Sequence, residues 1–146
     1  MKYLRFLLVS LVLFVFQACG EKPVDVSVEL PPTPTFETNE DIKLTTPQPG
    51  DVLSGSISVK GEAKGFWFFE AQLDVEIVDE KGNLIAKTFA SSMEDWMTTD
   101  FVPFEAYFGV LDFGESKEGK LILKKANASG LPENDASFEI PVKFGN

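Results

Sequence analysis

The chain has 146 residues, a formal net charge of −10, no histidine and a single cysteine. So acidic a protein is repelled by nucleic acid and by anionic lipid headgroups, which makes both poor partners. The lack of histidine excludes histidine triads and histidine metal sites, and one cysteine cannot form an intramolecular disulfide.

The first 18 residues have the layout of a bacterial export signal. Lys2 and Arg5 provide a positive start, and residues 6–16 form an apolar run interrupted only by Ser10. This run is shorter than the roughly 17–25 residues that a membrane-spanning helix needs. We therefore expect residues 1–18 to be a cleaved signal peptide, with a short signal anchor as an alternative.

Cys19 follows the expected cleavage point directly. Residues 16–19, Phe-Gln-Ala-Cys, resemble a bacterial lipobox, although Phe16 stands where leucine is common and Gln17 is larger than usual. The resemblance implies a diacylglyceryl group on the Cys19 sulfur and an acyl chain such as palmitate on the new N-terminus. Two or more chains, at ~0.8 kcal/mol per buried methylene, anchor a protein stably. We expect an extracytoplasmic lipoprotein on a bacterial membrane; the alternative is a plain signal peptide that leaves a free thiol.

Residues 19–41 have the composition of a linker. Proline and acidic side chains dominate the segment, and both favour an extended chain of up to ~3.1 Å per residue. Loss of residues 1–18 would leave eleven cations, 23 acidic residues and a net charge of −12. The prolines are Pro23, Pro31, Pro32 and Pro34, and the acidic residues are Glu21, Asp25, Glu29, Glu37, Glu40 and Asp41.

From Ile42 onward the apolar residues recur at every second position, which predicts β-strands. The longest alternating run predicts one strand face that continues from Trp67 through Phe69 and Ala71 to Ile77. Residues 79–83 predict a hairpin with Gly82 in a left-handed conformation. Pro141 cannot donate a ladder hydrogen bond, so the last strand is expected at a sheet edge or at a bulge. The predicted strands cover residues 42–44, 57–63, 67–77, 84–89, 102–110, 121–123 and 138–144.

Seven short strands separated by turns, without helical patterns, predict an all-β fold. The strand number and the length of residues 42–146 fit one domain, an immunoglobulin-like antiparallel β-sandwich. The Cys–Trp–Cys core of antibody domains is absent from the sequence.

Three segments give the sequence a specific resemblance. In order, they are residues 61–71 with Gly65-Phe66-Trp67, residues 95–106 with Asp95-Trp96-Met97, and residues 128–142 with Gly130-Leu131-Pro132. Together they resemble the immunoglobulin-like domain associated with bacterial spore germination proteins, the Gmad type. The resemblance implies an extracytoplasmic accessory domain, often lipid-anchored, that binds or organises partners without a known ligand. The chain shows no companion germination domain, so a general envelope role is expected.

Two aromatic positions are candidate ligand-binding residues. Trp67, or its neighbour Phe66, is a candidate platform for stacking a sugar ring, and the competing interpretation is burial in the core. Trp96 lies in a predicted irregular loop, where it either plugs one end of the sandwich or faces a ligand.

Two polar segments invite a calcium hypothesis: Glu94, Asp95 and Asp100 in the first, and Glu133, Asn134 and Asp135 in the second. Calcium takes six to eight oxygen ligands. Neither segment has the alternate-residue spacing of a calcium loop, and capping of loop amides explains these side chains equally well. We therefore expect no metal and no cofactor. Asn127-Ala128-Ser129 matches the glycosylation acceptor pattern, which we interpret as accidental in a bacterial lipoprotein.

No catalytic site is expected. Paired carboxylates about 5–9.5 Å apart are the one remaining route to hydrolysis, and nothing in the sequence selects such a pair. The leading hypothesis is a non-catalytic cell-envelope lipoprotein, a binding or scaffold module that contacts another envelope protein or presents an edge strand. The alternative is a carbohydrate- or peptidoglycan-binding module that uses Trp67 and Trp96.

Overall fold

A computed structural model describes residues 39–145, so the predicted signal peptide, Cys19 and most of the linker lie outside the described residues. Within this range the chain forms eight strands and two 3-10 turns. No helix of residues 39–145 has the length and apolar character needed to cross a bilayer. The strands are β1 (Ile42–Thr46), β2 (Val52–Leu53), β3 (Ile57–Lys64), β4 (Gln72–Asp79), β5 (Leu84–Ser92), β6 (Phe101–Phe108), β7 (Glu118–Lys124) and β8 (Ser137–Phe144), and the turns are η1 (Gly65–Trp67) and η2 (Pro132–Asn134).

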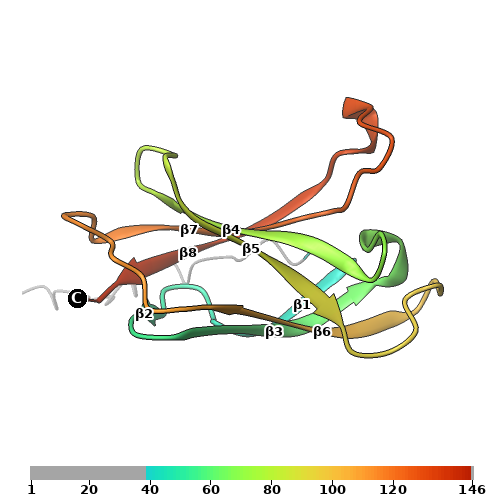
Figure 1. Cartoon of the computed structure of the whole chain (residues 1–146), viewed down its shortest axis with the longest axis horizontal. Helices are drawn as coiled ribbons and strands as arrows, with labels where there is room; N and C mark the ends of the chain where they lie inside the picture. The colour runs from blue at the N-terminus through green and yellow to red at the C-terminus, as the bar shows by residue number, and fades with distance from the viewer. Residues whose placement is uncertain (1–38, 146) are drawn as a thin grey trace, which may run out of the picture. The chain divides into compact units, whose positions relative to one another are not determined.

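The strands form one curled sheet in the order β1-β3-β6-β5-β4-β7-β8-β2. All neighbours are antiparallel except β2 and β8. The sheet turns over between β6 and β5, so that β1, β3 and β6 face β5, β4, β7 and β8 across the core (Figure 1). The predicted all-β, immunoglobulin-like sandwich is confirmed. It has eight strands rather than about seven, because β2 has only two residues and is too short to produce an alternating pattern.

The core consists of the inward-facing residues of the strands, which alternate with outward-facing residues along the chain. Phe113 joins them from the loop between β6 and β7, where its ring stacks on Phe144 with centroids 4.3 Å apart. Val110, predicted to continue the buried face of β6, is exposed because that strand ends at Phe108. Burial of each large apolar side chain contributes about 1.5–3 kcal/mol, which allows a domain of this size to fold without a disulfide. The most deeply buried side chains include Val59, Leu73, Val75, Ile77, Phe104, Leu121, Leu123 and Val142.

The hairpin between β4 and β5 forms as predicted. Gly82 has a φ of +84°, the left-handed conformation that favours glycine. The Asp79 carboxylate accepts hydrogen bonds from the backbone N–H groups of Lys81 and Asn83 and from the Asn83 side chain. These bonds, led by that from the Asn83 side chain, lower the pKa of Asp79.

Pro141 lies at a sheet edge, as predicted. Its carbonyl accepts a hydrogen bond from the Gly50 N–H at 2.7 Å, on the side of β8 that faces away from β7. Because the N and O of one residue point to the same side of a strand, the missing N–H also faces away from β7. Only the two-residue β2 pairs with β8 on that side, so the ladder with β7 stays intact.

Candidate binding surface at the loop end

Three loops meet at one end of the sandwich, which we call the loop end. They are the segment 65–71, which includes η1, the loop 93–100 between β5 and β6, and the loop 125–136 between β7 and β8, which includes η2 (Figure 1). All sequence-predicted ligand-binding residues of the domain lie in these loops. The fold therefore brings to one end residues that are as far apart in the chain as positions 67 and 135.

Backbone hydrogen bonds connect the loops to one another. The Gly65 N–H donates to the Asp100 carbonyl at 3.1 Å, and the Ala126 N–H donates to the Trp67 carbonyl at 2.9 Å. Gly65 also allows a close approach, because a Cβ at this position would lie 2.0 Å from the Thr98 carbonyl oxygen. The loop end is thus held in a defined conformation by main-chain contacts.

The aromatic run 66–69 divides between the core and the surface. Trp67 is 1% exposed and Phe68 is buried, whereas Phe66 is 49% exposed and Phe69 is 48% exposed. The prediction of one continuous strand face is therefore wrong for Phe69 and Ala71. The chain leaves the strand conformation in η1, and Ala71 has a positive φ of 63°, so alternation resumes only in β4.

Burial settles which aromatic side chains are accessible. Trp67 has no free face on which a sugar ring could stack, and its buried indole N–H has no hydrogen-bond partner within residues 39–145. Trp96 is half-buried: it packs against the core, in agreement with the predicted plug, and part of the residue stays accessible.

Two methionines beside Trp96 are the residues that sequence reasoning missed. Met97 is 76% exposed, and Met93 is also largely exposed. Methionine is flexible and polarizable, and it is common on surfaces that bind other proteins. The sequence signal that could have identified them is a pair of methionines flanking a tryptophan in a segment without strand periodicity. Together with Phe66 and Phe69, these side chains give each of two neighbouring loops an exposed apolar pair.

The acidic candidates are all exposed, and the polar side chains around them order the loops. Asp95 accepts a hydrogen bond from the Met97 N–H, and Asp135 accepts one from the Asn127 side chain. The Thr98 hydroxyl accepts a bond from the Asp100 N–H, and Glu133 lies in η2. No group of three or more acidic side chains in residues 39–145 is arranged to hold a metal ion. Capping of a loop amide therefore explains Asp95, and a side-chain hydrogen bond with Asn127 explains Asp135.

Asn127 organises the loop 125–136. Its carboxamide oxygen accepts hydrogen bonds from the Ser129 N–H, the Ser129 hydroxyl and the Gly130 N–H. Its nitrogen donates to the Leu131 carbonyl and to Asp135. The Asn127 side chain, which matched the glycosylation pattern, thus forms its hydrogen bonds within the loop. Its bond to the Leu131 carbonyl holds the exposed Leu131 at the tip.

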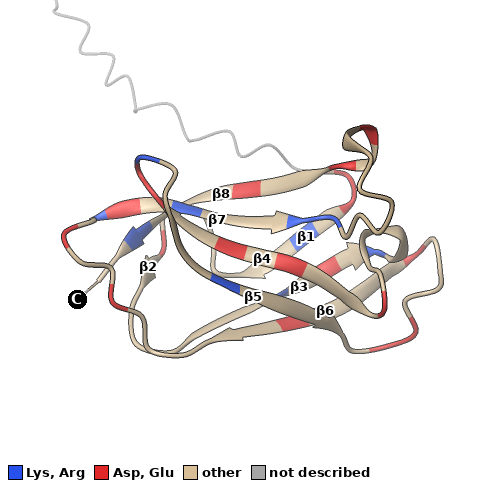
Figure 2. Cartoon of the chain, turned by 45° about the horizontal axis from the view of Figure 1, so that its top comes forward, with Lys and Arg blue, Asp and Glu red and all other residues tan. Residues whose placement is uncertain are grey.

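The loop end is rich in negative charge. Acidic residues occur on all three loops (Figure 2), namely Glu70, Glu94, Asp95, Asp100, Glu133 and Asp135. The nearby cations lie over aromatic rings: Lys125 is 5.5 Å from the centroid of Phe66, and Lys64 is 4.2 Å from that of Phe101. Apolar side chains surrounded by carboxylates favour a partner surface that is apolar and basic.

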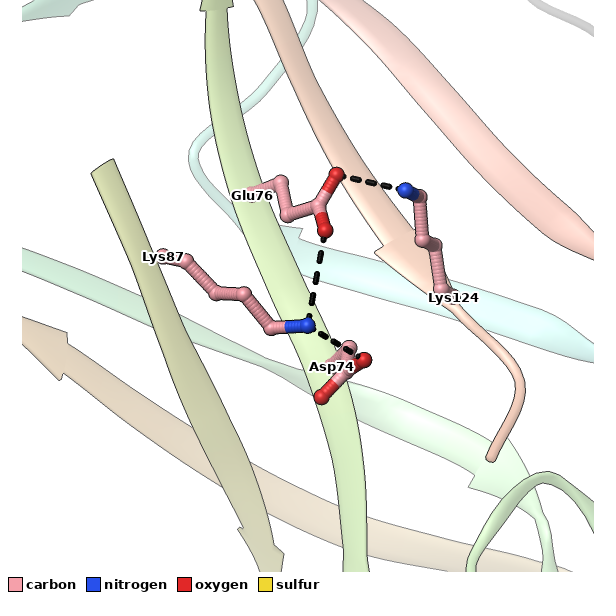
Figure 3. A network of polar contacts seen from close by, with 4 residues as sticks. All are labelled: Asp74, Glu76, Lys87 and Lys124. Carbon is pink, nitrogen blue, oxygen red and sulfur yellow. Dashed lines mark hydrogen bonds and ion pairs between the residues drawn. The ribbon is translucent and has the colours of Figure 1, made fainter. Parts of the chain in front are cut away.

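Away from the loop end, a hollow of about 780 Å³ lies on the outer face of β4, β7 and β8 next to the hairpin. Four of the charged side chains that line it form two ion pairs, and Lys87 contacts one of these pairs from beside the hollow. Lys124 contacts Glu76 at 2.6 Å, Lys120 contacts Glu139 at 2.6 Å, and Lys87 of β5 bridges Asp74 and Glu76 (Figure 3). The hydrogen bond to Asp74 raises the pKa of Lys87. Internally paired charges of this kind offer little to a charged ligand, so the loop end is the stronger candidate.

Comparison with known proteins identifies one family. A family model described as Gmad2, the immunoglobulin-like domain of bacterial spore germination, matches residues 41–131. The match extends from the residue before β1 into the loop 125–136, and it therefore includes seven of the eight strands and most of the loop end. No curated protein matches the chain.

Proposed function

The chain belongs to the Gmad2 family of immunoglobulin-like domains of bacterial spore germination, and on this premise we propose that it is a non-catalytic binding module of the cell envelope. A domain of this family suggests binding or scaffolding rather than chemistry. The absence of histidine from the sequence agrees with this, because it removes the commonest general acid–base group. The proposal has two parts, a membrane anchor and a partner surface.

The anchor part assigns residues 1–18 to a signal peptide, a lipid to Cys19, and residues 19–41 to a linker that leads into the domain 42–146. Its support is the sequence of residues 1–19, with a positive start, a short apolar run and Ala18 before Cys19. Labelling of growing cells with radioactive palmitate tests it. We expect label on the wild-type protein and none on Cys19→Ser, which should leave the membrane fraction. Equal labelling of the variant would contradict the anchor.

The partner surface is the loop end. The observation that carries this part is the group of exposed apolar side chains, Phe66, Phe69, Met93 and Met97, on loops tied together by main-chain hydrogen bonds. A preorganised apolar group loses little conformational entropy on binding, and aromatic and methionine side chains are enriched in protein interfaces. The surrounding carboxylates then select a basic partner and speed its association. We infer that the partner is another protein of the envelope.

Site-specific photo-crosslinking in intact cells tests the partner surface. A photoreactive amino acid replaces Met97 in one strain and, as a matched control, the equally exposed Val110 at the opposite end of the sandwich. We expect a discrete crosslinked protein from position 97 that is absent from position 110. The same crosslinks from both positions, or none from position 97, would contradict the proposal.

Carbohydrate binding is the other outcome to be tested. Titration with peptidoglycan fragments would change the tryptophan fluorescence if a sugar stacked on the accessible part of Trp96, and Trp96→Phe would reduce the change. For a protein-binding module we expect no saturable change. A saturable signal that the variant loses would replace protein binding with glycan binding.

A further inference from the structure

The side of the sandwich between β5 and β6 is open. These strands pair only through Ser91 with Glu105 and Ser92 with Phe104. From that point toward the hairpin they diverge, β5 staying with β4 and β6 with β3 (Figure 1). Most of β5 is therefore paired on one side only.

The backbone groups on the open side of β5 can be assigned from the hydrogen bonds at its end. The Ser92 N–H donates to the Ala71 carbonyl, on the β4 side, and the next residue, Met93, donates to the Pro103 carbonyl on the β6 side. Successive residues of a strand alternate in direction, so the N–H and C=O groups of Phe89 and Lys87 point to the open side. Within residues 39–145 these backbone groups have no hydrogen-bond partner. The Phe89 side chain is 54% exposed, so residues 39–145 leave about half of its surface at this edge accessible.

Near the two ends of the sheet, neighbouring segments of the chain supply hydrogen-bond partners to the outer strands. On β1, the Gln48 side chain donates to the Leu44 carbonyl at 2.9 Å, and the Ile42 N–H donates to the Asn39 carbonyl at 3.2 Å. On β8, Gly50 donates to Pro141, and Lys143 donates to Asp51 at 2.8 Å. Natural proteins protect edges in such ways because unpaired strands associate. Among residues 39–145, no segment supplies such partners to the open side of β5 at Lys87 and Phe89.

Lysine often protects an edge strand, but Lys87 does not do so here. Its amino group lies 2.7 Å from Asp74 and 3.6 Å from Glu76, on the outer face of the sheet (Figure 3). The side chain is thus directed toward β4 and away from the free N–H and C=O groups. An approaching strand would meet accessible amides and the exposed ring of Phe89.

We propose that β5 accepts an extended segment of another protein as an added strand, and that this segment is apolar and basic. Free backbone groups at alternate residues recognise an extended chain specifically, and pockets for alternate side chains add selectivity. A second copy of this chain is disfavoured. The nineteen acidic residues and ten lysines of residues 39–145 give each copy a net negative charge, so two copies repel each other and a basic segment is attracted.

The inference deepens the proposed function, because it adds a backbone contact to the same class of basic partner. Two synthetic nonapeptides serve as probes on the full-length protein in detergent, one alternating valine with lysine and the other alternating valine with glutamate. Hydrogen exchange resolved to single residues reports where each peptide binds. We expect the valine–lysine peptide to slow exchange of the Lys87 and Phe89 amides at least tenfold and the valine–glutamate peptide to bind at least tenfold more weakly.

Substitutions at position 89 distinguish the contribution of the backbone N–H to peptide binding from that of the Phe89 side chain. Phe89→Pro removes an N–H that no other strand uses, and we expect it to abolish protection of β5, whereas Phe89→Ala keeps the amide and retains most of the binding. If Phe89→Pro does not fold, Lys87→Pro removes the neighbouring outward N–H in its place. Binding by the proline variant equal to that of wild type, or exchange of Lys87 and Phe89 unchanged by both peptides, would overturn the inference. Protection confined to residues 93–100 would overturn it while leaving the loop end as the partner surface.

Discussion

The inner faces of the sheet and the loop end use apolar side chains in opposite ways. On β4, residues Leu73, Val75 and Ile77 follow strict alternation and are fully buried. In the segment just before that strand, alternation fails, and Phe66 and Phe69 are exposed on either side of the buried Trp67 and Phe68. The difference teaches that regular alternation on β4 identifies core residues, whereas the aromatic segment outside that alternation divides between the core and the surface.

The largest expected effect distinguishes Trp67 from its neighbour. Trp67→Ala removes a fully buried side chain and should lower the free energy of unfolding by about 3–5 kcal/mol. Phe66→Ala removes a half-exposed ring and should cost less than about 1 kcal/mol. Urea unfolding followed by circular dichroism measures both. Similar losses of unfolding free energy in the two variants would contradict the distinction between a core Trp67 and a surface Phe66.

Gly65 tests whether the loop end depends on close main-chain packing. In Gly65→Ala the new methyl group would lie 2.0 Å from the Thr98 carbonyl oxygen, so the loop 93–100 must move. Overpacking of this kind costs about 1–3 kcal/mol. Gly109→Ala is a matched control, since a Cβ there has no neighbour within 4 Å. Thermal unfolding should shift strongly in the first variant and little in the second, and equal shifts would contradict a preorganised loop end.

Asn127→Ala should affect the loop 125–136 locally. The variant loses five hydrogen bonds, each worth about 0.5–1.5 kcal/mol before water replaces part of them. We expect amide exchange of residues 128–135 to accelerate while β4 and β7 stay protected. Asn134→Ala, which loses one side-chain bond to Ser129, should change exchange much less. Equal acceleration in both variants would show that Asn127 does not organise the loop.

Sequence reasoning predicted most of the fold and selected residues that the fold brings to one end of the sandwich, but it did not select the exposed Phe69, Met93 and Met97. Alternation located seven strands, because burial on one face imposes a period of two. It could not find β2, which has two residues, or Phe113, whose burial depends on stacking with Phe144 rather than on a local pattern. It also carried the face of β4 back through Phe69, because a 3-10 turn in an aromatic segment has no period-two signal.

The site residues illustrate the same limit. Trp67, with Phe66 as its alternative, and Trp96 were selected for their chemistry. The accessible surface belongs to Phe66, Met97 and part of Trp96, and Trp67 is buried. Exposure of a loop residue depends on which other loops cover it. For Trp67 the covering partners are far away in the chain, as the bond from Ala126 to its carbonyl illustrates. No property of residues 66–69 alone could have separated the exposed pair from the buried pair.

The smallest expected effect concerns pH at the opposite end of the domain. Hydrogen bonds from Asn83 keep the pKa of Asp79 below its ordinary value in the folded state. Their contribution to stability is therefore present above the unfolded pKa, near 4, and is lost as the pH falls through the lower folded value. Between pH 7 and pH 3, the free energy of unfolding should therefore decrease less in Asn83→Ala than in the wild-type protein. Identical losses in urea unfolding would contradict the role of this contact.

The central claim is that the exposed apolar residues of the loop end bind another protein. The most direct measurement is the yield of the photo-crosslink from position 97 in cells, compared between Phe66→Ser and the matched variant Leu84→Ser, which removes a similarly exposed apolar side chain beside the hairpin. We predict that Phe66→Ser lowers the yield at least fivefold without altering the amount of protein, and that Leu84→Ser leaves it unchanged. An unchanged yield in Phe66→Ser, or an equal decrease in both variants, would contradict the account.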